Sequence, residues 1–409
     1  NDGNYTSQSL YAQTNYVLAR AVAMGLSQTA IANAALTWET TYITNVGLDY
    51  NVLGNRLSGS IEFFNKKTDG ILIDLPAPMV HGNATIPKQN AAQVTNKGLE
   101  FSANWSDRAG KDFSYNIGFN FTYIKNNVDK FKGDDPSYDG ARMLKEGLPI
   151  WSLYVREVDR IVQTDEDLAL VQSMLDNPDV KGKVVFPYGT PQKGDILYKD
   201  LNGDGYITED DRTVIGNTNP KVQGGFGLSG QWKGFDFAMN FNFMLDFDVN
   251  NATAYQLSSS ESNKNKFYNV LSTFADKGWR YTRDGDGECL YKCYYIDGSL
   301  DMYRELNEGR TLWNPTDVTK KITHSYFIED GSFLRCQDLT VGYTLPGNLT
   351  SKWGISKARF YVSASNLFII TGYSGYDPEV DIQTGLTCGM DYNRYPRSRS
   401  FVLGTNITF

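Results

Sequence analysis

The stretch DFSYNIGFNFTYI, Asp112 to Ile124, decides the fold class because its side chains alternate strictly in polarity. One parity holds aromatic and aliphatic residues, and the other holds serine, asparagine, glycine and threonine. Successive side chains of a strand point to opposite faces, so this period of two predicts a strand with one apolar face and one polar face. Rings near both ends of the apolar face, opposite small uncharged residues, are typical of a strand whose apolar side meets lipid.

The same alternation recurs along the chain in RLSGSIEFF (56–64), GLEFSANWS (98–106), GFDFAMNFNFML (234–245) and FVLGTNITF (401–409). We therefore predict a transmembrane antiparallel β-barrel, an all-β fold. The eleven strands expected lie at about 40–54, 56–68, 96–106, 112–124, 139–147, 149–160, 221–232, 235–248, 334–345, 356–372 and 397–409.

The connections between these strands alternate in length. Short ones fall near 54–55, 107–111, 148, 233–234 and 346–355, and long ones fall at 69–95, 125–138, 161–220, 249–333 and 373–396. Short periplasmic turns and long extracellular loops are typical of outer-membrane barrels. An odd number of strands leaves two open edges, and unpaired backbone groups cannot face lipid, so further strands must come from elsewhere. The alanine-rich, helix-tolerant residues 1–36 are expected to form an extracellular loop segment.

Composition narrows the function classes. The 409-residue chain carries a formal net charge of -8 and no basic stripe, which argues against nucleic acid as a partner. Two histidines far apart, His81 and His324, make a histidine-rich metal site improbable, and no C-x-x-C pair is present. Cys289 and Cys293 could form a local disulfide or be two unrelated thiols. No apolar run reaches the roughly 18 residues of a membrane helix, and the start without methionine looks processed or truncated.

The segment KDLNGDGYITEDD, Lys199 to Asp211, has the spacing of a calcium-binding loop. Gly205 stands where such a loop turns sharply, and Ca²⁺ prefers oxygen ligands. The flanking residues read as extended, so a structural Ca²⁺ that stiffens an extracellular loop fits better than a sensor. The alternative is a turn rich in Asx and glycine that holds no ion. The predicted ligands are Asp200, Asn202, Asp204, the carbonyl of Tyr206 and Asp211, with Thr208 acting through water.

Aromatic residues in the expected loops could stack on sugar rings, pack against a protein lid, or pack against one another. They are Trp279, Tyr281, Tyr294, Tyr295, Trp313, Tyr373 and Tyr376. No hydrolytic motif of the G-x-S-x-G or H-E-x-x-H type occurs, and the run Asp165, Glu166, Asp167 is expected to be a solvated surface, so an enzyme is not expected. The terminal Phe409, after alternating apolar residues, resembles the signal that barrel-insertion machinery reads.

Several of these segments resemble the SusC/RagA-type TonB-dependent outer-membrane transporters. The resemblance covers most of residues 36–409 and is carried by LTWETTYITNVGLDYNVLGNRLSGSIEFFNKKTDGIL (36–72), VTNKGLEFSANW (94–105), GDILYKDLNGDGYITEDDRTVIGNTNPKVQGGFGLSGQWKGFDF (194–237), GSFLRCQDLTVGYTLP (331–346), ISKARFYVSASNLFIITGYSGYDPEV (355–380) and YPRSRSFVLGTNITF (395–409).

The resemblance implies a 22-stranded barrel filled by a plug domain. Residues 37–409 would form its C-terminal half, and the plug and first half would come from another segment or chain. It further implies a SusD-like surface lipoprotein as lid, the TonB complex acting through the plug, an oligosaccharide or peptide as cargo, and outer-membrane lipid around the barrel.

Two other readings stay open from the sequence. The first is a secreted all-β carbohydrate-binding protein with a structural calcium, and the second is a calcium-dependent glycan-degrading enzyme, for which no acid/base carboxylate pair is evident. The faces of the strands discriminate between barrel and sandwich, because a sandwich buries its apolar parity between two sheets.

Overall fold

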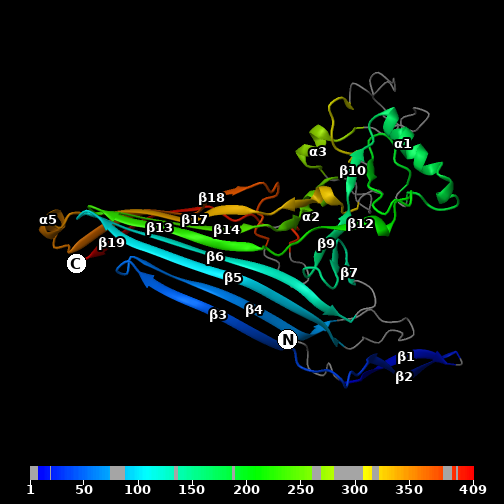
Figure 1. Cartoon of the computed structure of the whole chain (residues 1–409), viewed down its shortest axis with the longest axis horizontal. Helices are drawn as coiled ribbons and strands as arrows, with labels where there is room; N and C mark the ends of the chain where they lie inside the picture. Colours follow the sequence, from blue (N-terminus) through cyan, green and yellow to red (C-terminus); the bar gives the residue numbers. More distant parts are fainter. Residues whose placement is uncertain are drawn as a thin grey trace.

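A long antiparallel sheet with a body of short elements at one end makes up the protein (Figure 1). The computed structural model describes residues 8–18, 20–73, 88–132, 137–186, 189–259, 269–280, 307–315, 322–380, 389–392 and 395–409. Within those residues, no helix is both long enough and apolar enough to cross a bilayer.

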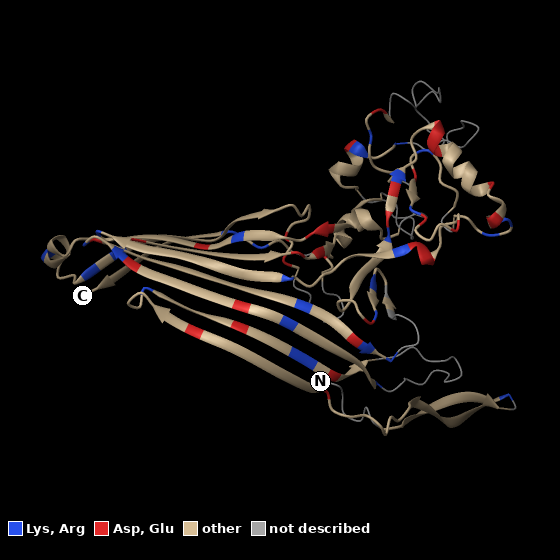
Figure 2. Ribbon diagram, viewed as in Figure 1, with Lys and Arg blue, Asp and Glu red and all other residues tan. Residues whose placement is uncertain are grey.

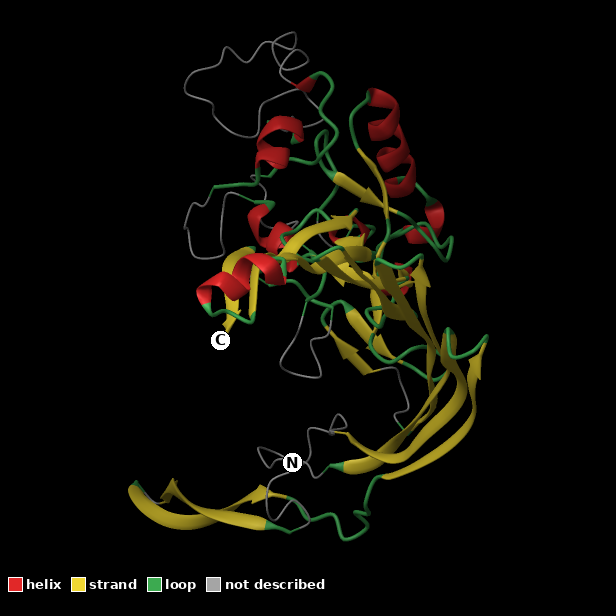
Figure 3. Cartoon of the chain, turned by 90° about the vertical axis from the view of Figure 1, so that its left-hand side faces the viewer, coloured by secondary structure: helices red, strands yellow, loops and turns green. Residues whose placement is uncertain are grey.

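Nine strands form the main sheet, in the order β19-β18-β17-β14-β13-β6-β5-β4-β3. Every neighbouring pair is antiparallel, and the sheet curves along its width (Figure 3). Its two outer strands, β3 and β19, have no further partner among the described residues. The strands are β3 (Thr40–Val52), β4 (Leu57–Ile73), β5 (Gln89–Ala109), β6 (Phe113–Phe131), β13 (Val222–Trp232), β14 (Phe235–Leu245), β17 (Phe333–Thr344), β18 (Lys357–Thr371) and β19 (Ser400–Thr408).

The apolar residues of these strands share one face and remain uncovered. Phe119 on β6 lies opposite Phe226 on β13 and Ala103 on β5, so the apolar parity continues across strand boundaries. Large apolar side chains of the face are widely exposed, with Phe63 at 59% and Leu403 at 84%. A sandwich would bury this face, so the exposed apolar parity excludes a sandwich and confirms the predicted all-β barrel type.

The opposite face is polar and hydrogen-bonded across strands. The Ser60 and Ser102 hydroxyl groups lie 2.8 Å apart, and Asn116 Nδ2 donates to Asn104 Oδ1 at 2.9 Å. Cross-strand hydrogen bonds of this kind satisfy polar groups of a face that meets water or protein. The predicted placement of small polar residues on this face is confirmed.

Connections of the main sheet alternate in length and sort to opposite ends (Figure 1). Residues 53–56, 110–112, 233–234 and 345–356 make the short connections, and the last contains α5 (Gly347–Thr350) and η6 (Ser351–Trp353). Lys233 and Gly234 both have positive φ, 46° and 92°, which is the two-residue hairpin turn that matches strand twist. The long connections 74–88, 132–221, 246–332 and 372–399 lie at the other end, so the predicted separation of short and long connections holds. The predicted short connection at 148 is wrong, because the residues around it lie within the single long connection 132–221.

Two of the eleven predicted strands are not part of the main sheet. The prediction of barrel strands at 139–147 and 149–160 is wrong, because these residues form short strands of the body: β7 (Ser137–Asp139), β8 (Arg142–Leu144), β9 (Ser152–Arg156) and β10 (Val158–Ile161). All three residues of β8 are buried, so the apparent alternation there came from packing within the body.

The N-terminal segment also differs from its prediction. The helix-tolerant stretch within residues 1–36 forms a hairpin of β1 (Leu10–Leu18) and β2 (Ala21–Ala30), with Leu18 paired to Ala21. Its placement as an extracellular loop segment stays a prediction.

The body at the long-loop end has its own apolar core, built on Val162, Val171, Val180, Leu197 and Ile207. Sheet β12-β9-β8-β7 and the pairs β10-β11 and β15-β16 belong to it. The strands of the body not yet given bounds are β11 (Ile196–Tyr198), β12 (Arg212–Gly216), β15 (Asp248–Asn250) and β16 (Ile328–Asp330). Its described helices are α1 (Asp165–Leu175), η2 (Pro178–Val180), η3 (Glu209–Asp211), α2 (Ala252–Leu257), α3 (Ser272–Lys277) and η5 (Ser325–Phe327).

Candidate functional site

The predicted ion loop, residues 200–211, lies in the body between β11 and β12. Ile207 is 1% exposed within the body core, and its amide donates to the Val185 carbonyl at 2.8 Å. Gly205 has φ 84°, and a Cβ there would lie 2.5 Å from Asn177 Nδ2. The backbone conformation therefore favours glycine at the sharp turn, and a larger residue would also displace the Asn177 side chain.

The carboxylates of the loop accept hydrogen bonds from its own backbone. Asp200 accepts from the amides of Gly203 and Gly205 at 2.7 and 2.8 Å, and Asp204 accepts from the Tyr206 amide at 3.1 Å. Asn202 Oδ1 accepts from the Asp204 amide at 2.9 Å. These contacts wrap the first half of the loop around its oxygen-bearing side chains.

Asp211, the twelfth residue of the loop, is fully buried. Its two carboxylate oxygens accept from the amides of Leu201 and Thr208, at 2.9 and 2.7 Å, so it ties the end of the loop to its beginning. In the described ranges, no three His, Cys, Asp or Glu side chains form a group that could hold a metal ion. Each carboxylate oxygen retains a second acceptor site, so the donor chemistry still suits Ca²⁺, and the calcium site stays a prediction.

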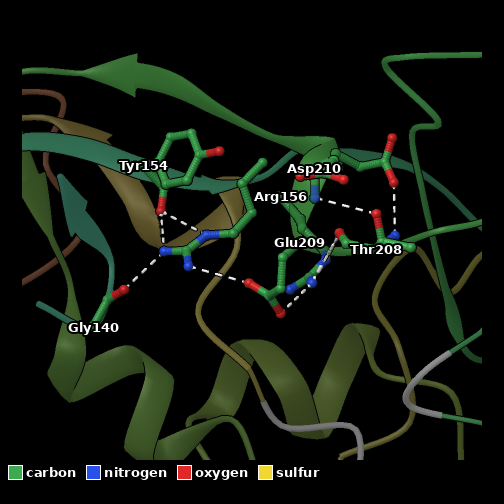
Figure 4. Close-up of polar contacts among 8 residues, drawn as sticks. Gly140, Tyr154, Arg156, Thr208, Glu209 and Asp210 are labelled. Carbon is green, nitrogen blue, oxygen red and sulfur yellow. Dashed lines mark hydrogen bonds and ion pairs between the residues drawn. The ribbon is translucent and has the colours of Figure 1, made fainter. Parts of the chain in front are cut away.

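Two arginines hold the loop against β9 (Figure 4). Arg156, only 5% exposed, donates to the Thr208 carbonyl at 3.0 Å and to Glu209 Oε1 at 2.7 Å. Arg212 donates to the Tyr154 carbonyl at 2.6 Å, to Gly140 at 2.8 Å and to Glu209 Oε2 at 3.2 Å. Partial burial raises the pKa of Glu209, but the two guanidinium groups outweigh burial and hold this pKa below its ordinary value.

The loop aromatics have different environments. Trp313 packs edge-on against Phe274 and Phe327, and Tyr373, 6% exposed, donates its hydroxyl hydrogen to Asp391 Oδ2 at 2.6 Å. Trp279 is 5% exposed, whereas Tyr376 is 72% exposed. Of the four, Tyr376 alone presents its ring to solvent; Tyr281, Tyr294, Tyr295, Cys289 and Cys293 lie outside the described residues.

The acidic run Asp165, Glu166, Asp167, predicted to be solvated, forms the first turn of helix α1. Asp167 accepts hydrogen bonds from the amides of Gln163 and Thr164, at 2.9 and 3.0 Å, as a capping residue of the helix N-terminus. Asp165 forms an ion pair with Lys193. These contacts give the run a structural role in the body.

Sequence reasoning missed a charged network on the polar face of β17 and β18. Arg335, 3% exposed, donates to Asn366 Oδ1 and Asp377 Oδ1, each at 2.6 Å. Arg397 forms an ion pair with Glu379 at 3.0 Å. The network fastens two parts of the 372–399 connection beside a hollow that is lined by Arg335, Gln337, Asp338, Asn366, Tyr395 and Arg397. Its partners come from distant positions, so no local motif marks it.

An antiparallel sheet with an exposed apolar face, a polar face and long loops at one end defines a section of a transmembrane β-barrel. Residues 3–252 match the family model described as TonB dependent receptor-like, beta-barrel, which covers more than half of the chain. The chain therefore belongs to this family, a receptor family of outer-membrane β-barrels.

Comparison with individual proteins supports the same family assignment. TonB-dependent receptor P3 of Formosa agariphila is 29% identical over 94% of this chain and 36% of its own length. TonB-dependent receptor SusC of Bacteroides thetaiotaomicron is 28% identical over 92% of this chain and 32% of its own length. The solved structure of the RagAB peptide transporter superposes with a TM-score of 0.71 at 24% identity, covering 100% of this chain and 39% of that one.

These comparisons confirm the resemblance to SusC/RagA-type receptors. The chain spans about a third of the length of the curated relatives it matches.

Proposed function

We propose that this chain forms the C-terminal section of a TonB-dependent importer in the outer membrane, which takes up oligosaccharides or peptides. The sheet leaves β3 and β19 unpaired among the described residues, and an open edge in lipid would carry unsatisfied backbone groups. Strands from the rest of the barrel would pair with both edges, and a plug would fill the polar side. The exposed apolar face carries this proposal, because lipid is the environment that favours it.

In this proposal the cargo binds at the polar face of the sheet, near the long-loop end. The hollow beside Arg335 offers guanidinium, carboxylate and amide groups next to Tyr395, a residue that is 91% exposed. Such a mixture can bind a sugar or a peptide through stacking and hydrogen bonds. A SusD-like lipoprotein would close the long-loop end, and the TonB complex would act through the plug.

Uptake by cells carrying the complete gene tests this function. A deletion strain should lose import of a defined oligosaccharide or peptide pool, and the wild-type gene should restore it. Import should also stop in cells that lack TonB, because energy would come from that complex. Unchanged import after deletion, together with a purified protein that stays dispersed without detergent, would contradict the proposal.

We also propose that residues 200–211 bind one structural Ca²⁺, held by Asp200, Asn202, Asp204, the Tyr206 carbonyl and Asp211. The ion would offset repulsion among these acidic groups and stiffen a loop already wrapped by its own hydrogen bonds. Its role would be mechanical, keeping β11 and β12 in place below the long-loop surface.

Limited proteolysis with and without chelator tests this site. Wild-type protein should become more sensitive to cleavage within 200–211 when Ca²⁺ is removed, and Asp204→Ala should be sensitive in both conditions. Asp210→Ala is the matched control, because position 210 is not among the predicted ligands, and it should keep the calcium effect. Equal cleavage of wild type with Ca²⁺ and with chelator would argue against the ion.

A further inference from the structure

Three lysines project from the apolar face of the main sheet, on adjacent strands and at one level. They are Lys67 on β4, Lys97 on β5 and Lys125 on β6. Lys97 lies directly opposite Lys125, and Lys67 lies opposite Thr95, two residues from Lys97. Figure 2 shows basic positions side by side on these three strands. The lysines therefore form one basic row across the sheet.

The direction of the row follows from strand parity. Lys67, Lys97 and Lys125 share parity with Phe63, Leu99 and Tyr123, and no register shift separates the members of each pair. Each lysine stands on the long-loop side of its apolar neighbour, because β4 and β6 run toward that end and β5 runs away from it. The row thus borders the apolar band where the band ends, below the long loops.

Charge balance within the row is incomplete. Like charges directly opposite each other across a strand pair are destabilising, as for Lys97 and Lys125. Asp129 attracts Lys67 and Lys97 electrostatically, but its hydrogen bonds come from Thr95 and Asn127. In the part of the chain that the structure describes, no carboxylate lies within ion-pair distance of the three lysines.

A neighbouring lysine shows the contrast. Lys221, just before β13, is neutralised by both carboxylate oxygens of Asp246, at 2.9 and 3.0 Å. Pairing within the chain is thus available at this end of the sheet. Among the described residues, the three lysines of the basic row have no carboxylate at ion-pair distance. An anion from outside the chain is therefore the complementary ligand.

A hollow of about 320 Å³ adjoins the row and adds further basic groups. Tyr42, which lies opposite Lys67, belongs to its lining. Lys130 and Lys132 also line it, with Asp69 as the acidic member. Together the row and the hollow bring five lysines against Asp69 and Asp129 on one small surface.

We infer that this surface binds the phosphate groups of a phosphorylated glycolipid in the outer leaflet. The inference rests on the proposed outer-membrane function, because it needs lipid at the apolar face. Acyl chains would lie along the apolar band, and phosphates attached to the sugar headgroup would reach the lysines at its border. Lysine binds phosphate as a point charge, and Tyr42 with its neighbours could hydrogen-bond the sugar.

Titration with a defined lipopolysaccharide, before and after phosphatase treatment, tests the inference on the complete, detergent-solubilised protein. The triple variant Lys67→Gln, Lys97→Gln, Lys125→Gln should bind the phosphorylated form at least tenfold more weakly than wild type. A matched triple variant at the short-turn end, Lys111→Gln, Lys233→Gln, Lys357→Gln, should bind like wild type. Wild type should also prefer the phosphorylated form at least tenfold, a comparison that needs no variant to fold.

Three results would overturn the inference: equal binding of both lipid forms by wild type, undiminished binding by the first triple variant, or full displacement of lipid by millimolar inorganic phosphate. Cargo uptake is followed in the same strains. Lost lipid preference with normal uptake would remove this inference and leave the importer intact. If the restored gene does not recover uptake while the protein keeps its lipid preference, only the importer proposal is contradicted.

Discussion

Phe226 on β13 and Phe241 on β14 lie directly opposite each other, and their rings stack with centroids 4.4 Å apart and planes inclined by 14°. Both rings stand on the apolar face of the main sheet, where no second sheet covers them within the described residues. Stacked cross-strand rings fix the register of the two strands. Their uncovered outer surfaces match hydrocarbon rather than water.

A lysine should be costly on the apolar face and tolerated on the polar face. Val362 on β18 lies opposite Val341 and Leu403, in the middle of the apolar band. Val362→Lys should lower the free energy of unfolding in lipid by about 2–4 kcal/mol. Ser363→Lys, one residue along on the other face, should cost about 1 kcal/mol or less. Urea titration of the refolded protein in lipid vesicles measures both, and equal costs would contradict the assignment of faces.

Gly205 should be harder to replace than Gly203, although both have positive φ, 84° and 74°. Alanine at either position pays the left-handed backbone cost of about 1–2 kcal/mol. At Gly205 the new Cβ would also press on Asn177, whereas nothing lies within 4 Å at Gly203. Protease sensitivity of the 200–211 loop should therefore rise more in Gly205→Ala than in Gly203→Ala. The reverse order would show that the turn has another conformation.

Acid should loosen the attachment of the ion loop to β9. The ordinary pKa of a glutamate is 4.5, and Arg156 and Arg212 hold the pKa of Glu209 below it. A carboxylate with a lowered folded-state pKa adds stability above pH 4.5, and this stability is lost as pH falls through the folded value. Hydrogen exchange of residues 208–211, corrected for intrinsic rates, should speed up below pH 4.5 in wild type. Glu209→Gln should show no such change, and a matching change there would assign it to another group.

His324 should make the body sensitive to a milder acid range. Its ring is packed against Trp313 and Phe327, with centroids 4.9 and 4.7 Å away, and burial lowers its pKa from 6.5 to about 3. The unfolded chain then binds more protons than the folded one below pH 6.5, so the stability of the body falls as pH drops from 6.5 toward 3. The loss is on the order of 1 kcal/mol per pH unit.

Denaturant titration followed by tryptophan fluorescence at pH 7.5 and pH 5 measures this effect. His324→Phe keeps an aromatic ring in the site and removes the titrating group, so its stability should change less between these pH values. An equal change in both proteins would place the titration elsewhere.

Local patterns predicted most of the main sheet. Alternation located all nine strands of the main sheet, because each strand has one uncovered apolar face with a period of two. The pattern failed at β8, where Arg142, Met143 and Leu144 are all buried by the body and parity carries no information. Local reasoning also failed at Leu10–Ala30, where the alanines suit a helix but β1 and β2 pair as a hairpin.

The contacts around the candidate site that could not be predicted from the sequence are those between residues far apart in the chain. The predicted ligand positions of the ion loop fall within twelve residues, so the spacing alone is enough to propose them, and they stay a prediction. Arg156 and Glu209 are 53 residues apart, and Arg335 and Asp377 are 42 apart, so only the folded chain brings each pair together. The hollow beside Arg335 could not be predicted for the same reason.

Spin labels on two consecutive residues of β6 test the central claim, that the apolar face meets hydrocarbon. Phe119→Cys and Asn120→Cys are prepared in the complete protein, in a background in which the four cysteines of this chain and any others are replaced. Each variant is then spin-labelled and reconstituted in lipid vesicles. The label at 119 should collide mainly with oxygen, which concentrates in lipid, and the label at 120 mainly with a water-soluble nickel reagent or with neither. A label at 119 that is more accessible to nickel than to oxygen would contradict the account.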